Sequence, residues 1–193
     1  MNTKLILALA LCTAPVMAAP AVTLLPTKND RALTIAADYT RYENNNNNVD
    51  TTSYGATLKY DKVLAPMNNG NYWSWNAAFN YSIGSEAGGP GAKDNEFTTM
   101  CVQLGIDANI VTNKNLSVFV GPRVGYHVFE WDEGNNNKTK SIMFGYSAGI
   151  RYLTQGGTGI EVGYTHGYYN DTKDDNGMGN NTHSIYAGVS FGF

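Results

Sequence analysis

Residues 72–85 read YWSWNAAFNYSIGS, and large apolar side chains alternate in them with small polar ones. Successive side chains of a β-strand point to opposite faces, so a period of two is typical of a strand. One face carries Trp73, Trp75, Ala77, Phe79, Tyr81 and Ile83, and the other carries Ser74, Asn76, Ala78, Asn80, Ser82 and Gly84. The stretch therefore predicts a strand with one apolar face and one small, polar face.

The same alternation recurs in residues 32–42, 52–63, 97–111, 116–131, 141–154, 159–169 and 183–193. The polar face is the small one, which suits the cramped lumen of a narrow barrel, whereas a water-facing sheet more usually carries Lys and Glu. In a membrane an open sheet edge would leave unpaired amides in hydrocarbon, so the sheet must close, and eight strands is the smallest usual number. We expect an all-β protein, an eight-stranded antiparallel up-and-down transmembrane β-barrel.

Composition limits the number of domains and the class of protein. A chain of 193 residues with 42% hydrophobic and 15% charged residues holds one ordinary domain. No stretch after residue 20 reaches the roughly eighteen consecutive apolar residues that a membrane-spanning helix needs, so any membrane span must be by strands. The 13 basic and 16 acidic residues give no basic footprint for nucleic acid.

The N-terminus has the features of a secretory signal peptide. Lys4 supplies the positive start, residues 5–11 the apolar middle, and residues 16–18 the small-residue cleavage site. A buried first strand is the alternative, but this apolar run has no period of two. We expect a signal peptide at 1–18, a periplasmic segment at 19–31 and the outer-membrane barrel at 32–193. Cys101 then remains alone, so an intramolecular disulfide cannot form, and its role is left open.

The connections between the expected strands alternate between long polar segments and mostly shorter ones, as outer-membrane barrels require. The long segments, 43–50, 86–96, 132–140 and 170–182, are expected outside, and 64–71, 112–115 and 155–158 are expected as periplasmic turns. Within the fifth strand, Pro122 cannot donate to a ladder, so we expect a bulge or a missing bond there.

Aromatic residues near the strand ends predict two girdles at the membrane interfaces. The periplasmic girdle would hold Tyr60, Trp73, Trp75, Tyr152 and Phe191. The outer girdle would hold Tyr42, Tyr54, Tyr81, Phe97, Tyr126, Trp131 and Tyr168.

Charged residues on the polar face are the main candidates for a site inside the barrel. The set is three acidic and three basic residues: Asp38, Lys59, Asp107, Arg123, Arg151 and Glu161. The interior of an eight-stranded barrel is just filled by side chains, and buried charges persist when paired. We interpret the set as a structural ion-pair and hydrogen-bond network, with a gated or wet path as the alternative.

The last ten residues, SIYAGVSFGF, end on an aromatic residue with apolar positions spaced by two behind it. Val189, Phe191 and Phe193 in this strand look like the outer-membrane insertion signal. With the signal peptide and the eight-strand pattern, the chain resembles the small outer-membrane barrel family that includes outer-membrane protein X and the opacity and protein A type barrel domains. The resemblance implies insertion by the barrel assembly machinery and contact with outer-membrane lipid and lipopolysaccharide.

Catalysis and metal binding receive little support. An acyl hydrolase needs a Ser, a His and an acid together, and the candidates are His166, which has Tyr168 where the lipid A deacylase type of barrel has a Ser, and His127 with Ser147. Near Gly177, the group Asp171, Asp174 and Asp175 lacks the spacing of a calcium loop. No cofactor is expected.

The fold transfers within such a family better than the function does. Our leading hypothesis is a non-enzymatic outer-membrane barrel, an envelope-structural or surface-interaction protein that displays polar loops to an extracellular partner the sequence does not name. A narrow or gated porin-like channel is the second hypothesis, and a lipid-modifying outer-membrane enzyme is the third.

Overall fold

The computed structural model describes residues 30–43, 50–86, 95–131, 138–154, 156–169 and 181–193. The strands are β1 (Arg31–Glu43), β2 (Asp50–Pro66), β3 (Tyr72–Glu86), β4 (Asn95–Val111), β5 (Leu116–Trp131), β6 (Lys138–Leu153), β7 (Thr158–Tyr169) and β8 (Asn181–Gly192). A short 3-10 turn, η1 (Asn68–Gly70), joins β2 to β3. The expected signal peptide, most of the segment before β1 and most of each long connection lie outside the described residues.

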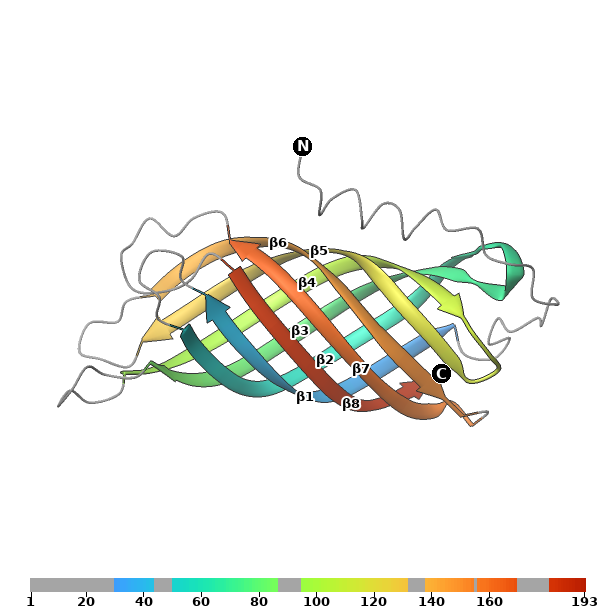
Figure 1. Cartoon of the computed structure of the whole chain (residues 1–193), viewed down its shortest axis with the longest axis horizontal. Coiled ribbons are helices and arrows are strands. Elements are labelled where there is room, and N and C mark those ends of the chain that lie inside the picture. Colours follow the sequence, from blue (N-terminus) through green and yellow to red (C-terminus); the bar gives the residue numbers. More distant parts are fainter. Residues whose placement is uncertain (1–29, 44–49, 87–94, 132–137, 155, 170–180) are drawn as a thin grey trace.

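The eight strands form one closed barrel in which each strand pairs with its neighbours in sequence and β8 returns to β1 (Figure 1). All pairings are antiparallel, and the closing pair runs from Ala32 opposite Gly192 to Glu43 opposite Asn181. Beyond that ladder, the Arg31 and Phe193 amides donate to each other's carbonyl oxygens at 3.2 and 2.9 Å. The predicted fold class is confirmed.

The barrel has two distinct ends. We call the end that holds Arg31, Gly192 and the connections β2–β3, β4–β5 and β6–β7 the turn end, and the opposite end the loop end (Figure 1). The turn between β2 and β3 is shorter than expected, because β2 continues to Pro66 with an irregularity between Val63 and Ala65. Among the described residues, no helix has the length and apolar character needed to cross a membrane.

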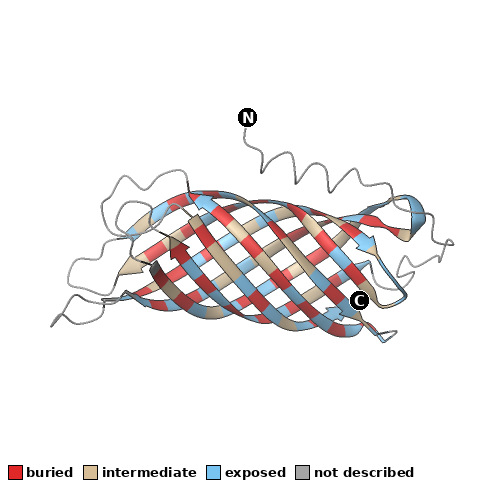
Figure 2. Cartoon of the chain, viewed as in Figure 1, coloured by how far each residue is buried: buried red, intermediate tan, exposed pale blue. Residues whose placement is uncertain are grey.

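Burial alternates residue by residue along the strands, so each strand has a lumen face and an outer face (Figure 2). The lumen face carries mainly Thr, Ser, Asn, Gly and paired charges. The outer face carries large apolar side chains that are a third to two thirds exposed, among them Ile35, Leu58, Phe79, Val102, Phe144, Ile160 and Val189. This distribution is the reverse of that in a water-soluble protein, and it suits a barrel surrounded by lipid.

Three large rings fit inside the narrow lumen because each lies directly opposite a glycine on the neighbouring strand. The opposed pairs are Gly84 with Phe97, Gly149 with Phe119, and Gly163 with Tyr186. A Cβ atom added at these glycines would lie 2.2, 2.4 and 2.3 Å from the facing ring. No side chain larger than hydrogen fits there while the rings keep their positions.

Pro122 lies where the β4–β5 ladder is interrupted. Pairing stops after Gly105 opposite Arg123 and resumes in the same register at Ala108 opposite Val120. The two strands therefore lose their pairing at Pro122 without a shift in register, and the expected local interruption is confirmed.

Part of the predicted outer girdle is wrong. Tyr42 and Phe97 are buried inside the lumen, each 2% exposed, and Trp131 packs against them from the inward-facing register of β5. The period-two alternation of each strand already predicts that these three side chains face the lumen. The girdle was predicted from the size of the rings alone, without this alternation. Tyr54, Tyr81, Tyr126 and Tyr168 do lie on the outer face, as do Trp73, Tyr152 and Phe191 near the turn end.

Candidate functional site

An ion cluster crosses the lumen in its turn-end half. Glu161 on β7 accepts from Lys59 of β2 at 2.7 Å and from the Arg151 Nε of β6 at 2.6 Å. Asp61 completes the cluster, because its carboxylate lies 2.8 Å from Arg151 Nη2 and 3.4 Å from Lys59 Nζ. All four side chains are at most 4% exposed. Two cations and two carboxylates therefore neutralise each other in a site closed to solvent.

Two aromatic residues pack into the ion cluster. Phe119, which is fully buried, has Lys59 Nζ 4.3 Å and Arg151 Cζ 5.7 Å from the centre of its ring. Tyr186 donates its hydroxyl proton to Glu161 at 2.9 Å. Cation–π contact and charge-assisted hydrogen bonds give the cluster a fixed geometry across the lumen.

A second ionic group lies at mid-barrel. Arg123 contacts both oxygens of Asp107, Nη1 to Oδ1 at 2.7 Å and Nη2 to Oδ2 at 3.0 Å, in the bidentate geometry that makes such pairs strong. Its Nη2 also donates to Ser147 at 3.0 Å, and the Asn76 amide donates to Asp107 at 2.8 Å. These contacts connect β3, β4 and β5 with one another and, through Ser147, with β6.

The loop end of the lumen is filled by a lid of large apolar side chains. We define the aromatic lid as Tyr42, Phe97, Phe129, Met143 and Tyr169, with Trp131 packed against it. Ring centroids of Tyr42 lie 5.9 Å from Phe97 and 5.4 Å from Phe129, both in edge-to-face arrangement. A short hydrogen bond of 2.5 Å joins His127 Nδ1 to the Tyr169 hydroxyl beneath the lid.

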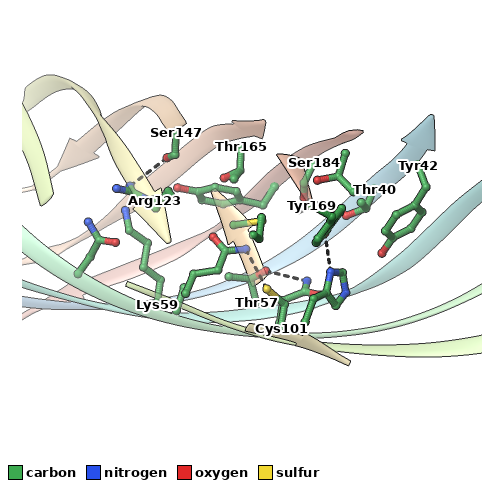
Figure 3. Close-up of a pocket in the computed structure, with 18 residues that line it drawn as sticks. Thr40, Tyr42, Thr57, Lys59, Cys101, Arg123, Ser147, Thr165, Tyr169 and Ser184 are labelled. Atoms are coloured by element: carbon green, nitrogen blue, oxygen red, sulfur yellow. Dashed lines mark hydrogen bonds between the residues drawn. The ribbon is translucent and has the colours of Figure 1, made fainter. Parts of the chain in front are cut away.

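A chamber lies between the lid and the ion cluster (Figure 3). Its volume is about 40 Å³, and Tyr42 and Tyr169 of the lid and Lys59 and Tyr186 of the ion cluster all contribute to its wall. A separate hollow at the turn end, lined by Asp30, Tyr72 and Arg151 among others, lies on the far side of the ion cluster. The lumen is therefore divided rather than continuous.

The six lumen charges predicted from the sequence are all buried inside the barrel, and the structure divides them into groups. Lys59, Arg151 and Glu161 meet in the ion cluster, and Arg123 meets Asp107. Asp38 lies apart and accepts from Thr57 at 3.1 Å. Sequence reasoning missed Asp61, although it stands two residues after Lys59 and shares its face.

The catalytic candidates do not assemble as a hydrolase. Ser147 bonds Arg123 rather than His127, whose ring nitrogen is bonded to Tyr169. His166 lies on the outer face with its ring centre 4.9 Å from that of His183, a residue the sequence reasoning overlooked. The hydroxyl that contacts His183 belongs to Tyr164 and is a phenol, not a serine. Asp171, Asp174 and Asp175 lie outside the described residues, and no cluster of three metal-ligating side chains occurs within them.

A closed eight-stranded barrel with an apolar outer face and a polar, ion-paired lumen defines an integral outer-membrane barrel protein. The family model described as outer membrane protein beta-barrel domain matches residues 5–193, and the chain belongs to that family. No curated protein matches the chain.

Solved structures that share the fold include the following two. Neisserial surface protein A is 16% identical with a TM-score of 0.60, over 85% of this chain and 97% of that one. Ail, the attachment invasion locus protein of Yersinia pestis, is 16% identical with a TM-score of 0.56, over 86% of this chain and 99% of that one.

Proposed function

We propose that the protein is a non-enzymatic outer-membrane barrel that acts as an envelope or surface-interaction protein and does not conduct. The division of the lumen by the ion cluster carries this proposal. Glu161 joins cations from β2 and β6, so a solute moving along the axis would have to break buried charge pairs. Breaking such a pair costs about 3–5 kcal/mol because it leaves an uncompensated buried charge.

The aromatic lid supports the same conclusion at the other end. Its five residues come from β1, β4, β5, β6 and β7, so they meet across the whole width of the lumen. A path for ions would have to pass both this lid and the ion cluster. Because the lumen is closed, an external partner would have to bind the connections at the loop end. We expect this end to face away from the cell.

Planar bilayer recordings test the absence of conduction. Refolded protein, verified by a heat-dependent shift in gel mobility, is expected to give no stable conductance steps. A general porin inserted in the same bilayer serves as the positive control. Steps that recur with one amplitude in the wild type, and disappear with heat-denatured protein, would contradict the proposal and favour the gated channel.

The gated channel is the second candidate, because hollows lie on both sides of the ion cluster. It makes a different prediction for the cluster itself. If the cluster is a gate, Lys59→Met together with Glu161→Met raises conductance well above that of the wild type. If the cluster is a structural plug, the apolar pair leaves the barrel silent, which is the result we expect.

Assembly in cells depends, in our proposal, on the outward apolar positions of β8. Phe193 is 54% exposed on the outside, so Phe193→Ala removes little buried area and the purified barrel is expected to refold as the wild type does. In cells, folded protein in the outer-membrane fraction is expected to fall to a small part of the wild-type level. Phe79→Ala, also outward and apolar but on β3, is the control. Equal losses for both variants would remove the special role of Phe193.

A further inference from the structure

Cys101, the free cysteine among the described residues, faces the chamber between the aromatic lid and the ion cluster (Figure 3). Its side chain is 3% exposed, and the Gln103 amide donates to its sulfur at 3.5 Å. His127 lies directly opposite on β5, is also 3% exposed and lines the same chamber. A thiol and an imidazole from neighbouring strands therefore share one buried cavity.

One ring nitrogen of His127 is without a hydrogen-bond partner. Nδ1 contacts the Tyr169 hydroxyl, whereas Nε2 is buried and has no partner among the described residues. Buried polar atoms in folded proteins usually have a partner, so this nitrogen is available to a ligand. When Nδ1 carries the proton and the Tyr169 oxygen accepts it, the lone pair of Nε2 is free. A histidine that binds a metal ion is usually held through its second nitrogen in this way.

A thioether lies in the wall of the same chamber. Met143 on β6 lines it, and a Cβ atom built on Gly167 of β7 would be 2.5 Å from the Met143 sulfur. A Cβ atom built on Gly125 of β5 would be 3.2 Å from the Met143 methyl carbon. The side chain therefore extends from β7 to β5, where Gly125 stands two residues before His127. Methionine has three rotatable bonds, so its sulfur can turn toward Cys101 and His127.

These three donors favour a soft, monovalent metal ion. Thiolate and thioether sulfur bind Cu(I), and imidazole binds copper as well. The thiol releases its proton to the solution when the metal binds, so the thiolate neutralises a single positive charge and the buried site gains no net charge. A divalent ion would leave one positive charge unpaired. Zinc also requires four ligands as a rule, and the described residues hold no cluster of three when only His, Cys, Asp and Glu are counted.

The dimensions of the chamber suit an ion and exclude an organic ligand. Its volume is about 40 Å³, whereas pockets for organic ligands measure about 300–1,000 Å³. Side chains directly opposed on antiparallel strands have Cβ atoms about 4.5–5.5 Å apart. An ion with bonds of about 2.3 Å to sulfur and about 2.0 Å to nitrogen can therefore join Cys101 to His127.

We propose that Cys101, His127 and Met143 bind a Cu(I) ion inside the barrel. Tyr169 and Gln103 position the imidazole and the thiolate, and the aromatic lid and the ion cluster shield the ion at either end. The site requires no conduction, so its failure would leave the non-conducting proposal intact.

Binding is tested on the full barrel refolded in detergent with Cu(I), which ascorbate keeps reduced in the absence of oxygen. The ion is present during refolding because the chamber is closed at both ends once the barrel has formed. Elemental mass spectrometry after gel filtration measures the copper retained, and we expect about one copper per folded barrel. X-ray absorption at the copper edge is expected to show sulfur and nitrogen ligands. Zn²⁺ supplied in the same way is expected to be lost on gel filtration.

Three variants distinguish the full site from copper held by the thiol alone. Cys101→Ser is expected to abolish retention. His127→Gln and Met143→Leu are each expected to weaken the affinity, measured by competition with a Cu(I) chelator, at least about tenfold, because the loss of even an outer-shell partner costs about 10- to 100-fold. Met100→Leu makes the same change as Met143→Leu on the outer face of β4 and is expected to bind copper as the wild type does. Heat-dependent gel mobility confirms that each variant is folded.

Several results would overturn the proposal. The first is a wild-type barrel that retains no copper, and the second is undiminished retention by Cys101→Ser. Wild-type affinity in both His127→Gln and Met143→Leu would mean that copper binds the thiol alone. Retention of Zn²⁺ as tight as that of copper would overturn the assignment to a soft, monovalent ion.

Discussion

Glu161→Gln is expected to destabilise the barrel by about 3–5 kcal/mol, because it leaves Lys59 and Arg151 with Asp61 as their only carboxylate partner in the cluster. Glutamine keeps the size of the side chain, so the loss reports charge rather than packing. The free energy of unfolding is measured by urea titration of the refolded barrel in detergent or in lipid vesicles.

The control for this variant is Glu130→Gln. Glu130 pairs with Lys138 at 2.9 Å near the loop end, but its side chain is 36% exposed and that of Lys138 is 49% exposed. A pair of that kind contributes about 0–1 kcal/mol, because water screens both charges. If the two variants lost stability equally, the ion cluster could not be the structural plug we describe.

A double-mutant cycle separates the pair from its surroundings. Lys59→Met combined with Glu161→Gln removes one cation and one anion, and leaves Arg151 facing Asp61. The two substitutions together are expected to cost clearly less than the sum of the single losses, since the second removes the unpaired charge that the first creates. Strict additivity would mean that Lys59 and Glu161 do not interact.

The sequence predicts which charges face the lumen but not which of them meet. Arg151 and Glu161 are directly opposed on β6 and β7, so a correct register for the short turn between them would have paired them. Lys59 reaches Glu161 across the lumen from β2, which is not a neighbour of β7. That contact depends on the stagger of the strands around the closed barrel, a quantity that alternation along one strand does not contain.

The aromatic lid shows a different limit of sequence reasoning. The period-two alternation places Tyr42 and Phe97 inside, whereas the size of their rings argues against a place in a narrow lumen. For Phe97 the conflict is resolved by cross-strand pairing, since Gly84 lies directly opposite Phe97 and leaves room for its ring. The role of a small residue on the lumen face can therefore be predicted only together with the residue opposite it. His166 and His183 on the outer face follow the same rule, because they are adjacent only in the register of β7 with β8.

Gly163→Ala tests this pairing rule where it meets the ion cluster. The atoms nearest to an added Cβ at Gly163 all belong to the Tyr186 side chain, at 2.3–2.5 Å, so the ring must move. In the wild type the hydroxyl of this ring donates to Glu161. Overpacking costs about 1–3 kcal/mol and a lost hydrogen bond to a charged group about 1.5–3 kcal/mol. We therefore expect a loss of about 3–5 kcal/mol in the free energy of unfolding by the same urea titration.

Two companion variants make this result specific. Gly156→Ala adds a Cβ whose nearest atom is the Thr154 hydroxyl at 3.8 Å, so its stability is expected to stay near that of the wild type. Tyr186→Leu removes both the ring and the hydrogen bond, so adding Gly163→Ala to it should cost little more, because the atom that clashed is gone. A full additional loss in that double variant would place the strain in the β7 backbone instead. Gly163 would then be required by the backbone of β7 rather than by the Tyr186 ring that holds Glu161 in the ion cluster.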